Sequence, residues 1–192
     1  MNEVCRELRR WLDEGIQPCR VWINVSPRQL MDVRTAVTAA VDRFDLRPEM
    51  LGIEITERTF VDDPVRAGRT LSEIRDQGFS VAIDDFGVGC SSLGALKDYP
   101  LDKLTIDASF VRGLSRVGQD SEIVRAIVTL ARSLGLAVVA EGVETQKQLQ
   151  VLRARNVDTV QGNVVSGPLS GADASVYLVN PVSAGIMEAG AG

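Results

Sequence analysis

The sequence contains no histidine, which removes the commonest general base and the commonest zinc ligand from the chemistry available to the chain. It also has no apolar run near the roughly 20 residues of a membrane span. The N-terminal segment MNEVCRELRRWLDEG has the pattern of a charged amphipathic helix rather than of a signal peptide. We therefore expect no membrane contact by this chain, and chemistry limited to carboxylates, amides, hydroxyls and lysines.

Positive charge and cysteine are also scarce. The formal net charge is −5 and the pI about 4.9, so the chain offers no broad basic field for a DNA or RNA duplex. A phosphate-bearing ligand must then be bound locally, most simply through a metal ion. The three cysteines, Cys5, Cys19 and Cys90, lie far apart and lack metal-ligand spacing, which favours a cytoplasmic location over a disulfide framework.

The chain does contain a series of short apolar segments separated by helical patterns. Each segment is rich in β-branched residues and bounded by polar ones, which predicts strands at Val21–Val25, Leu51–Ile55, Val81–Ile83, Leu104–Ile106, Ala137–Ala140 and Thr159–Val160. Between them, residues 120–134 repeat apolar side chains at helix spacing and end before Gly135. Continuous apolar strands predict burial on both faces, and strand followed by helix predicts an α/β fold with a parallel sheet.

Polar side chains stand at the ends of these strands: Asn24, Glu54, Glu57, Asp84, Asp85, Asp107, Glu141 and Gln161. In a parallel barrel all strand C-termini open on one face, so these groups would converge. Their oxygens are ligands suited to Mg²⁺ or Mn²⁺, and the adjacent Asp84 and Asp85 can serve two ions while the glycines after them let the backbone turn. Taken singly, each residue is equally explained as a helix N-cap or a loop residue.

Five segments occur in order between about Val21 and Leu169: NVSPRQL, EITE, AIDDFGVGCSSLGALKDYPLDKLTIDASFV, AEGVET and QGNVVSGPL. This series resembles the EAL-domain family of cyclic di-GMP phosphodiesterases, which act in bacterial second-messenger signal transduction. The resemblance implies a TIM-like (β/α)8 barrel that hydrolyses cyclic di-GMP to pGpG with a pair of Mg²⁺ or Mn²⁺ ions.

Residue roles follow from the resemblance position by position. The residues matching metal ligands are Asn24, Glu54, Asp84, Asp85 and Glu141, and Glu141 also corresponds to a base for the attacking water. Glu57 corresponds to the glutamate that steadies the loop after DDFG. The other matching active-site residues are Asp107, Glu144 and Gln161, and the loop after Asp85 corresponds to a homodimer contact.

Departures from the family pattern bear on activity. Only about twenty residues precede NVS. We therefore expect the family's first two strands, its first helix and the glutamate of its signature Glu-Ala-Leu to be missing. About six strands then remain, and they form an incomplete barrel with open edges. Thr105 stands where the family has its catalytic lysine. Lys103 points to the same side of the strand but about 6.6 Å further from the mouth, and Lys97 lies in the segment before it.

Further departures remove an aromatic residue and an arginine at Asn163–Gly167, and place Cys90 where the family has tyrosine. Three hypotheses follow. The chain is an EAL-type domain with impaired or no hydrolysis that acts as a cyclic di-GMP-binding regulatory module, or it is an active phosphodiesterase when the domain is complete, or it is a non-catalytic protein-interaction module.

The expected regions are an N-terminal helix and connection at 1–20, the partial barrel domain at 21–180 and a flexible tail at 181–192.

Overall fold

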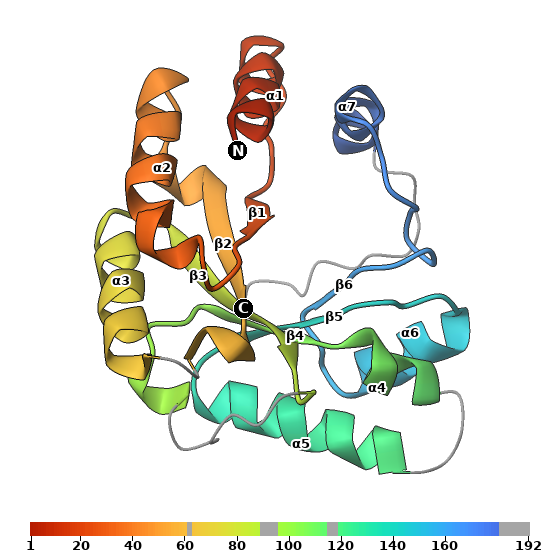
Figure 1. The fold of residues 1–192 in the computed structure, drawn as a ribbon. Coiled ribbons are helices and arrows are strands. Elements are labelled where there is room, and N and C mark those ends of the chain that lie inside the picture. Colours follow the sequence, from red (N-terminus) through yellow and green to blue (C-terminus); the bar gives the residue numbers. More distant parts are fainter. Residues whose placement is uncertain (61–62, 89–95, 115–118, 181–192) are drawn as a thin grey trace.

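A sheet of six parallel strands forms the centre of the computed structural model, which describes residues 1–60, 63–88, 96–114 and 119–180 (Figure 1). The strands are β1 (Val21–Asn24), β2 (Leu51–Thr56), β3 (Ser80–Phe86), β4 (Lys103–Ile106), β5 (Ala137–Ala140) and β6 (Thr159–Val160). Their order in the sheet is their order in the chain. Among the described residues β1 and β6 are not paired with each other. The sheet is therefore a half-barrel, and the predicted α/β fold with six strands is confirmed.

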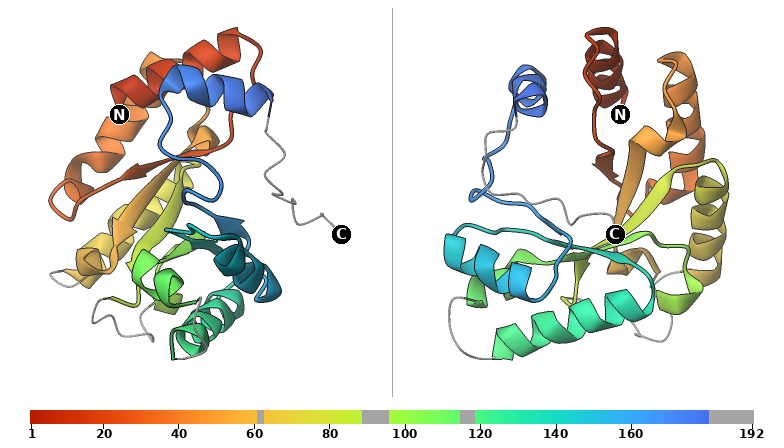
Figure 2. Two further views of the ribbon diagram at one scale, coloured as in Figure 1. Left: turned by 90° about the vertical axis from the view of Figure 1, so that its right-hand side faces the viewer. Right: turned by 180° about the vertical axis from the view of Figure 1, so that it is seen from behind.

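Helices cover one face of the curved sheet (Figures 1 and 2). They are α1 (Asn2–Asp13), α2 (Leu30–Arg43), α3 (Pro64–Asp76), α4 (Ala108–Gly113), α5 (Gln119–Ser133), α6 (Gln146–Ala154) and α7 (Gly171–Val179), with short 3-10 turns η1 (Pro48–Met50), η2 (Glu57–Phe60) and η3 (Leu96–Asp98). Local signals set several helix starts. Asp63 accepts a hydrogen bond from the Arg66 N–H before α3, and Thr145 and Gln148 form a capping box at α6.

The two faces of the sheet differ in composition. On the helix side, side chains such as Ile53, Val81 and Leu104 are fully buried and belong to one core with helix residues. The opposite, inner face carries small and polar residues at the alternate positions: Gly52, Glu54, Thr56, Ser80, Ala82, Asp84, Lys103 and Thr105. The predicted burial on both faces holds for β4 and for most of β2 and β3, although the inner face is polar rather than apolar. Strand alternation places the polar groups along this face as well as at the strand ends.

The first and last helices meet at one point. The Arg10 guanidinium donates to the carbonyl oxygen of Gly171 at 3.3 Å, and a side chain at Gly171 would overlap Glu7. Because α1 precedes β1 and α7 follows β6, this contact joins the helices next to the two edge strands of the sheet. The view in Figure 2 that faces the right-hand side of Figure 1 shows the two helices crossing.

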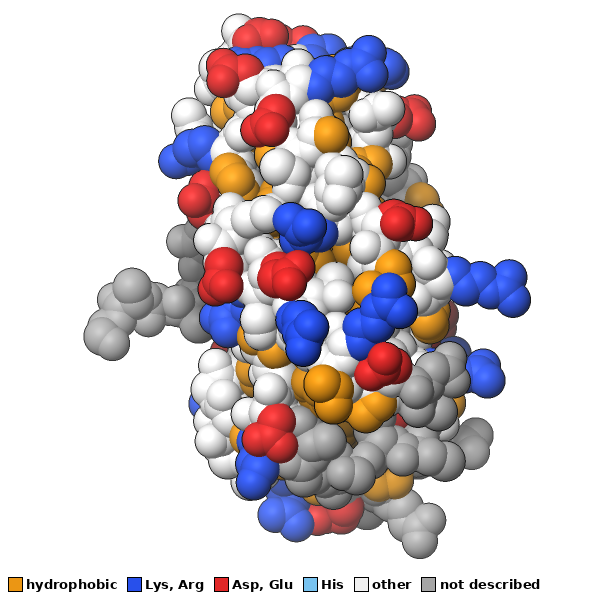
Figure 3. All heavy atoms as spheres, turned by 60° about the vertical axis from the view of Figure 1, so that its left-hand side comes forward, with side chains coloured by type: hydrophobic (Ala, Val, Ile, Leu, Met, Phe, Trp, Pro, Cys, Tyr) orange, Lys and Arg blue, Asp and Glu red, His pale blue; other side chains and the backbone are white. Residues whose placement is uncertain are grey.

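The outer surface carries charges of both signs. On the face that contains α2 and α3, Lys and Arg side chains are interspersed with Asp and Glu (Figure 3). One such pair joins the two helices, with Arg34 Nε 3.3 Å from Glu73 Oε2. This face therefore offers no single-sign field for a polyanion. Within the described ranges, no helix is long and apolar enough to cross a membrane.

Candidate active site

One row of the inner face joins residues from four strands. Asn24 is in register with Glu54, Glu54 with Ala82, and Ala82 with Lys103. Register partners on parallel strands point to the same face of the sheet. The Ala82 side chain is a single methyl group and is fully buried. The strand between Glu54 and Lys103 therefore leaves room for a long side chain to cross it.

Lys103 uses this room to form an ion pair with Glu54. Lys103 Nζ lies 2.7 Å from Glu54 Oε1, and the two side chains are 11% and 12% exposed. The same ammonium lies 3.7 Å from the centre of the Trp22 ring, a cation–π distance. That ring packs on Gly52, where an added Cβ would lie 2.3 Å from a ring carbon. A lysine that the sequence places deep in β4 thus reaches a predicted metal ligand on β2.

A bulge at the end of β3 brings the adjacent Asp84 and Asp85 to one site. The register of β3 with β4 shifts between Ile83 and Phe86, and Asp85 has a φ of +53°. The Asp85 N–H donates to Asp84 Oδ1 at 2.9 Å. In a regular strand neighbouring side chains point to opposite faces, whereas a bulge changes the direction of one of them. The bulge explains how a pair of successive carboxylates can act together.

Glu57 holds the turn that follows this bulge. Its Oε1 accepts a hydrogen bond from the Gly87 N–H at 3.1 Å, and its side chain is buried. Gly87 has a φ of +99°, and a Cβ there would lie 2.9 Å from the Phe110 ring, so the turn requires glycine. This contact is the one that the predicted steadying role of Glu57 requires.

The acidic groups on the inner face raise one another's pKa values. Burial raises the pKa of Glu141 to about 7, and the charges of Asp84, Glu54 and Asp85 act in the same direction, while Lys103 opposes them. Burial also raises the pKa of Asp84, with a further contribution from Glu54. Burial and the charge of Asp84 raise the pKa of Asp85. These shifts show that the carboxylates converge, and that the site favours an added positive charge.

Glu141 should make stability depend on pH in the presence of EDTA. Its folded pKa is about 7, above the ordinary glutamate value of about 4.3, so the folded state keeps a proton that the unfolded state releases. The stability that this proton contributes is full below about pH 4.3 and is lost as the pH rises toward 7. Urea unfolding of Glu141→Gln should lack this loss, which is on the order of 1–2 kcal/mol after allowance for solvent screening. If Glu141→Gln shows the same pH profile of stability as the unmodified chain, Glu141 is not the group responsible. Glu144→Gln, which changes an exposed glutamate, is the control and should keep the pH profile of the unmodified chain.

The remaining predicted residues lie at the strand ends with different surroundings. Asp107 caps α4, where its Oδ1 accepts from the Ser109 N–H at 2.8 Å. Burial alone would raise the pKa of Asp107, but the hydrogen bonds from Ser109 lower it. Glu144 is exposed and its N–H donates to the side chain of Gln148. Gln161 is exposed at the end of β6, where its N–H donates to the Ala140 carbonyl oxygen at 2.8 Å.

Thr105 presents a buried hydroxyl with no partner. Its side chain is 0% exposed, and among the described residues Oγ1 has no hydrogen-bond partner. It lies two residues after Lys103 and therefore on the same face of β4, nearer to the strand's carboxyl end. A buried hydroxyl without a partner is costly to the folded state. Lys97, the other lysine considered from the sequence, lies exposed in η3.

The donor chemistry of the inner face fits a hard divalent cation. Asp84, Asp85 and Glu141 offer oxygen ligands only, and their mutual repulsion would be relieved by a positive ion. In the part of the chain that the structure describes, no three acidic side chains form a ready-made ligand cluster. Glu54 differs from the other acids because its Oε1 already contacts the Lys103 ammonium.

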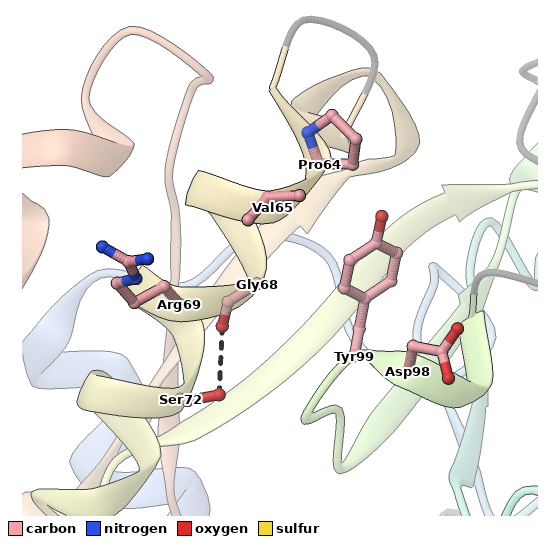
Figure 4. A pocket seen from close by; sticks show the side chains of 7 residues that line it. All are labelled: Pro64, Val65, Gly68, Arg69, Ser72, Asp98 and Tyr99. Carbon is pink, nitrogen blue, oxygen red and sulfur yellow. Dashed lines mark hydrogen bonds between the residues drawn. The ribbon is translucent and has the colours of Figure 1, made fainter.

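A separate cavity of about 340 Å³ lies on the outer side of the molecule and contains none of the predicted residues. Figure 4 shows it between α3 and the segment after η3, lined by Pro64, Val65, Gly68, Arg69, Ser72, Asp98 and Tyr99. The Ser72 hydroxyl donates to the Gly68 carbonyl oxygen at 3.0 Å. The Tyr99 ring stacks on Phe60 at 3.8 Å and supports one wall. This cavity has no group in common with the acidic site.

Sequence reasoning did not identify Trp22, Ala82 or the Lys103–Glu54 contact as parts of the site. The alternation of Gly52, Glu54 and Thr56 in β2 was a readable signal that this strand has a polar face. The predicted dimer contact after Asp85 falls partly on residues 89–95, and Cys90 and the tail at 181–192 also lie outside the described residues.

Known proteins share both the sequence and the fold of this chain. The sequence model of the EAL domain family matches residues 1–168 of this chain. The signaling protein YkoW of Bacillus subtilis (strain 168) is 35% identical over 171 residues, which is 88% of this chain and 21% of YkoW. MucR of Pseudomonas aeruginosa, described as a bifunctional diguanylate cyclase/cyclic di-GMP phosphodiesterase, is 37% identical over 88% of this chain and 25% of its own length. The chain thus spans about a fifth to a quarter of these curated relatives.

Solved structures give the same result for the fold. The MucR phosphodiesterase in complex with c-di-GMP matches with a TM-score of 0.86 and 36% identity over 90% of this chain and 71% of that one. The EAL domain of Mycobacterium smegmatis DcpA matches with a TM-score of 0.88 and 38% identity over 93% of this chain and 81% of that one.

Proposed function

The chain belongs to the EAL domain family, and on that premise we propose that it binds cyclic di-GMP with the help of a divalent metal ion and hydrolyses it very slowly or not at all. The observation that carries the proposal is the composition of β4. Thr105 places a neutral hydroxyl where the resemblance expects a charged lysine, and Lys103 is engaged with Glu54 one pleat deeper. Binding groups are thus retained while a charged contact at the reacting phosphate is absent.

The inner face supplies distinct groups for a phosphate ligand. Asp84, Asp85 and Glu141 would hold a Mg²⁺ or Mn²⁺ ion, which when bound neutralises phosphate charge and makes a coordinated water more acidic. The Thr105 hydroxyl is fully buried and would donate to a phosphate oxygen only if the groups that cover it move aside. Such a neutral contact is weaker than the charge-assisted bond that an ammonium would make. The predicted consequence is binding with little stabilisation of the transition state.

The family resemblance favours a second candidate function, an active phosphodiesterase in which Glu141 serves as the base for the attacking water. In this version Lys103 would have to leave Glu54 and contact the phosphate. The two functions differ in product, since the active enzyme releases pGpG and the receptor does not. The interaction-module hypothesis is supported by the outer edges of β1 and β6, which have no strand partner among the described residues.

Asp84→Asn tests the proposed binding site. We expect the variant to raise the Kd for cyclic di-GMP at least about 10-fold in Mg²⁺, because it removes an anionic ligand from the acidic site, and 10-fold corresponds to about 1.4 kcal/mol. Equilibrium dialysis with labelled cyclic di-GMP measures the change. Asp98→Asn, which alters the outer cavity instead, is the matched control. Equal affinity of Asp84→Asn and the unmodified chain would overturn the proposal.

A further inference from the structure

We infer that Lys103 is a built-in cation that takes the place of one metal ion at Glu54, so that this site binds a single divalent ion rather than a pair. The inference rests on the proposed function to the extent that a metal ion binds the inner face. It adds a specific role for a lysine that no position of the family pattern predicts. Its basis is the contact geometry of Lys103 and the charges around it.

The position of the Lys103 ammonium is fixed by its surroundings. It lies 2.7 Å from Glu54 Oε1 and 3.7 Å from the centre of the Trp22 ring. The ring cannot move toward the sheet because it already contacts Gly52. Ala82 leaves the path between β4 and β2 open, and residue Lys103 as a whole is 8% exposed. The ammonium is therefore largely shielded from water and is held by one carboxylate and one ring face.

A metal ion at Glu54 would have to displace this ammonium. Metal coordination uses the same carboxylate lone pairs that accept the hydrogen bond from Nζ, and two cations close together repel each other. The displaced ammonium would remain in the enclosed inner face without a counter-ion, which is unfavourable for a buried charge. Glu54 is therefore withdrawn from the set of metal ligands while Lys103 is present.

The carboxylates other than Glu54 remain available to a divalent ion. Lys103 neutralises Glu54, which leaves Asp84, Asp85 and Glu141, with Asp107 nearby, as the acids that still repel one another. Thr105 lies on the same face as Lys103 and is fully buried, and its neutral hydroxyl adds no charge to this group.

Manganese titration of the 192-residue chain tests the inference. Bound Mn²⁺ is counted by electron paramagnetic resonance of the free ion, without cyclic di-GMP. We expect one ion per unmodified chain and a second ion, or at least a 10-fold gain in affinity at a second site, in Lys103→Met. Lys97→Met, which changes an exposed lysine, should behave like the unmodified chain. Unchanged ion binding in Lys103→Met would overturn the inference.

The double variant Glu54→Gln/Lys103→Met keeps the test decisive if Lys103→Met alone does not fold. It removes both charges of the pair and leaves no buried ion without a partner. The inference predicts the same number of ions as in the unmodified chain. A smaller number would show that Glu54 is a ligand despite Lys103, and would overturn the inference. Because cyclic di-GMP is absent from this titration, failure of nucleotide binding is a separate result that bears on the proposed function alone.

Discussion

Lys103→Met should lower the free energy of unfolding by about 3 kcal/mol in EDTA, because it leaves the Glu54 carboxylate buried without its partner. Glu54 is 12% exposed and shares the inner face with Asp84 and Glu141, so no other positive group replaces the ammonium at 2.7 Å within the described ion pairs. The lost contact with the Trp22 ring adds to the effect. Urea unfolding followed by circular dichroism measures the change.

Two controls separate this effect from a general loss of packing. Lys97→Met alters an exposed lysine and should change stability by no more than about 0.5 kcal/mol. Glu54→Gln/Lys103→Met should recover most of the lost stability, since neither charge remains buried. A loss below about 1 kcal/mol in Lys103→Met would mean that the ion pair is screened by water and contributes little.

Moving the lysine by one pleat should raise hydrolysis of cyclic di-GMP. In Lys103→Thr/Thr105→Lys the charge moves two residues toward the carboxyl end of β4, to the position of the unpartnered Thr105 hydroxyl. Placing a charged donor where charge develops in a transition state is worth about 10²–10³ in rate. We expect a gain of about 10²-fold in pGpG formation, measured by chromatography of the products with Mg²⁺ and with Mn²⁺.

The single change Thr105→Lys is the informative comparison. It should gain less than the double variant, because two ammonium groups would then lie on the same face of one strand. Thr105→Met introduces a side chain about as long as lysine but without charge, and should not raise the rate of pGpG formation. If the double variant forms pGpG no faster than the unmodified chain, Thr105 is not what limits hydrolysis.

The fold was largely predictable because short strands and helix spacing are local signals. The predicted strand at Ala137–Ala140 matches β5, and the helix at 120–134 differs from α5 by one residue at each end. Burial on both faces was predicted from the continuous apolar runs, but the polar composition of the inner face was not, since three-residue runs such as Val81–Ile83 are too short to show alternation. The small Ala82 in that run faces inward, and this is visible only from the register with Glu54 and Lys103.

Parts of the site depended on contacts between strands and could not be read from the sequence. The sequence gives the depth of Lys103 along β4, but not the path over Ala82 that brings its ammonium to Glu54. Adjacent Asp84 and Asp85 suggested a shared site, whereas the bulge and the positive φ of Asp85 that unite them arise from pairing with β4. The raised pKa of Glu141 reflects acidic groups on neighbouring strands, while the roles assigned to these residues stay predictions.

Isothermal titration calorimetry of the unmodified chain with cyclic di-GMP tests whether the chain is a metal-dependent receptor. The titration is made in Mg²⁺ and repeated in EDTA, and the cell contents are then analysed for pGpG by chromatography. We expect heat of binding in Mg²⁺, its loss in EDTA, and recovery of intact cyclic di-GMP. Rapid formation of pGpG, or equal binding with and without the metal ion, would contradict the proposal.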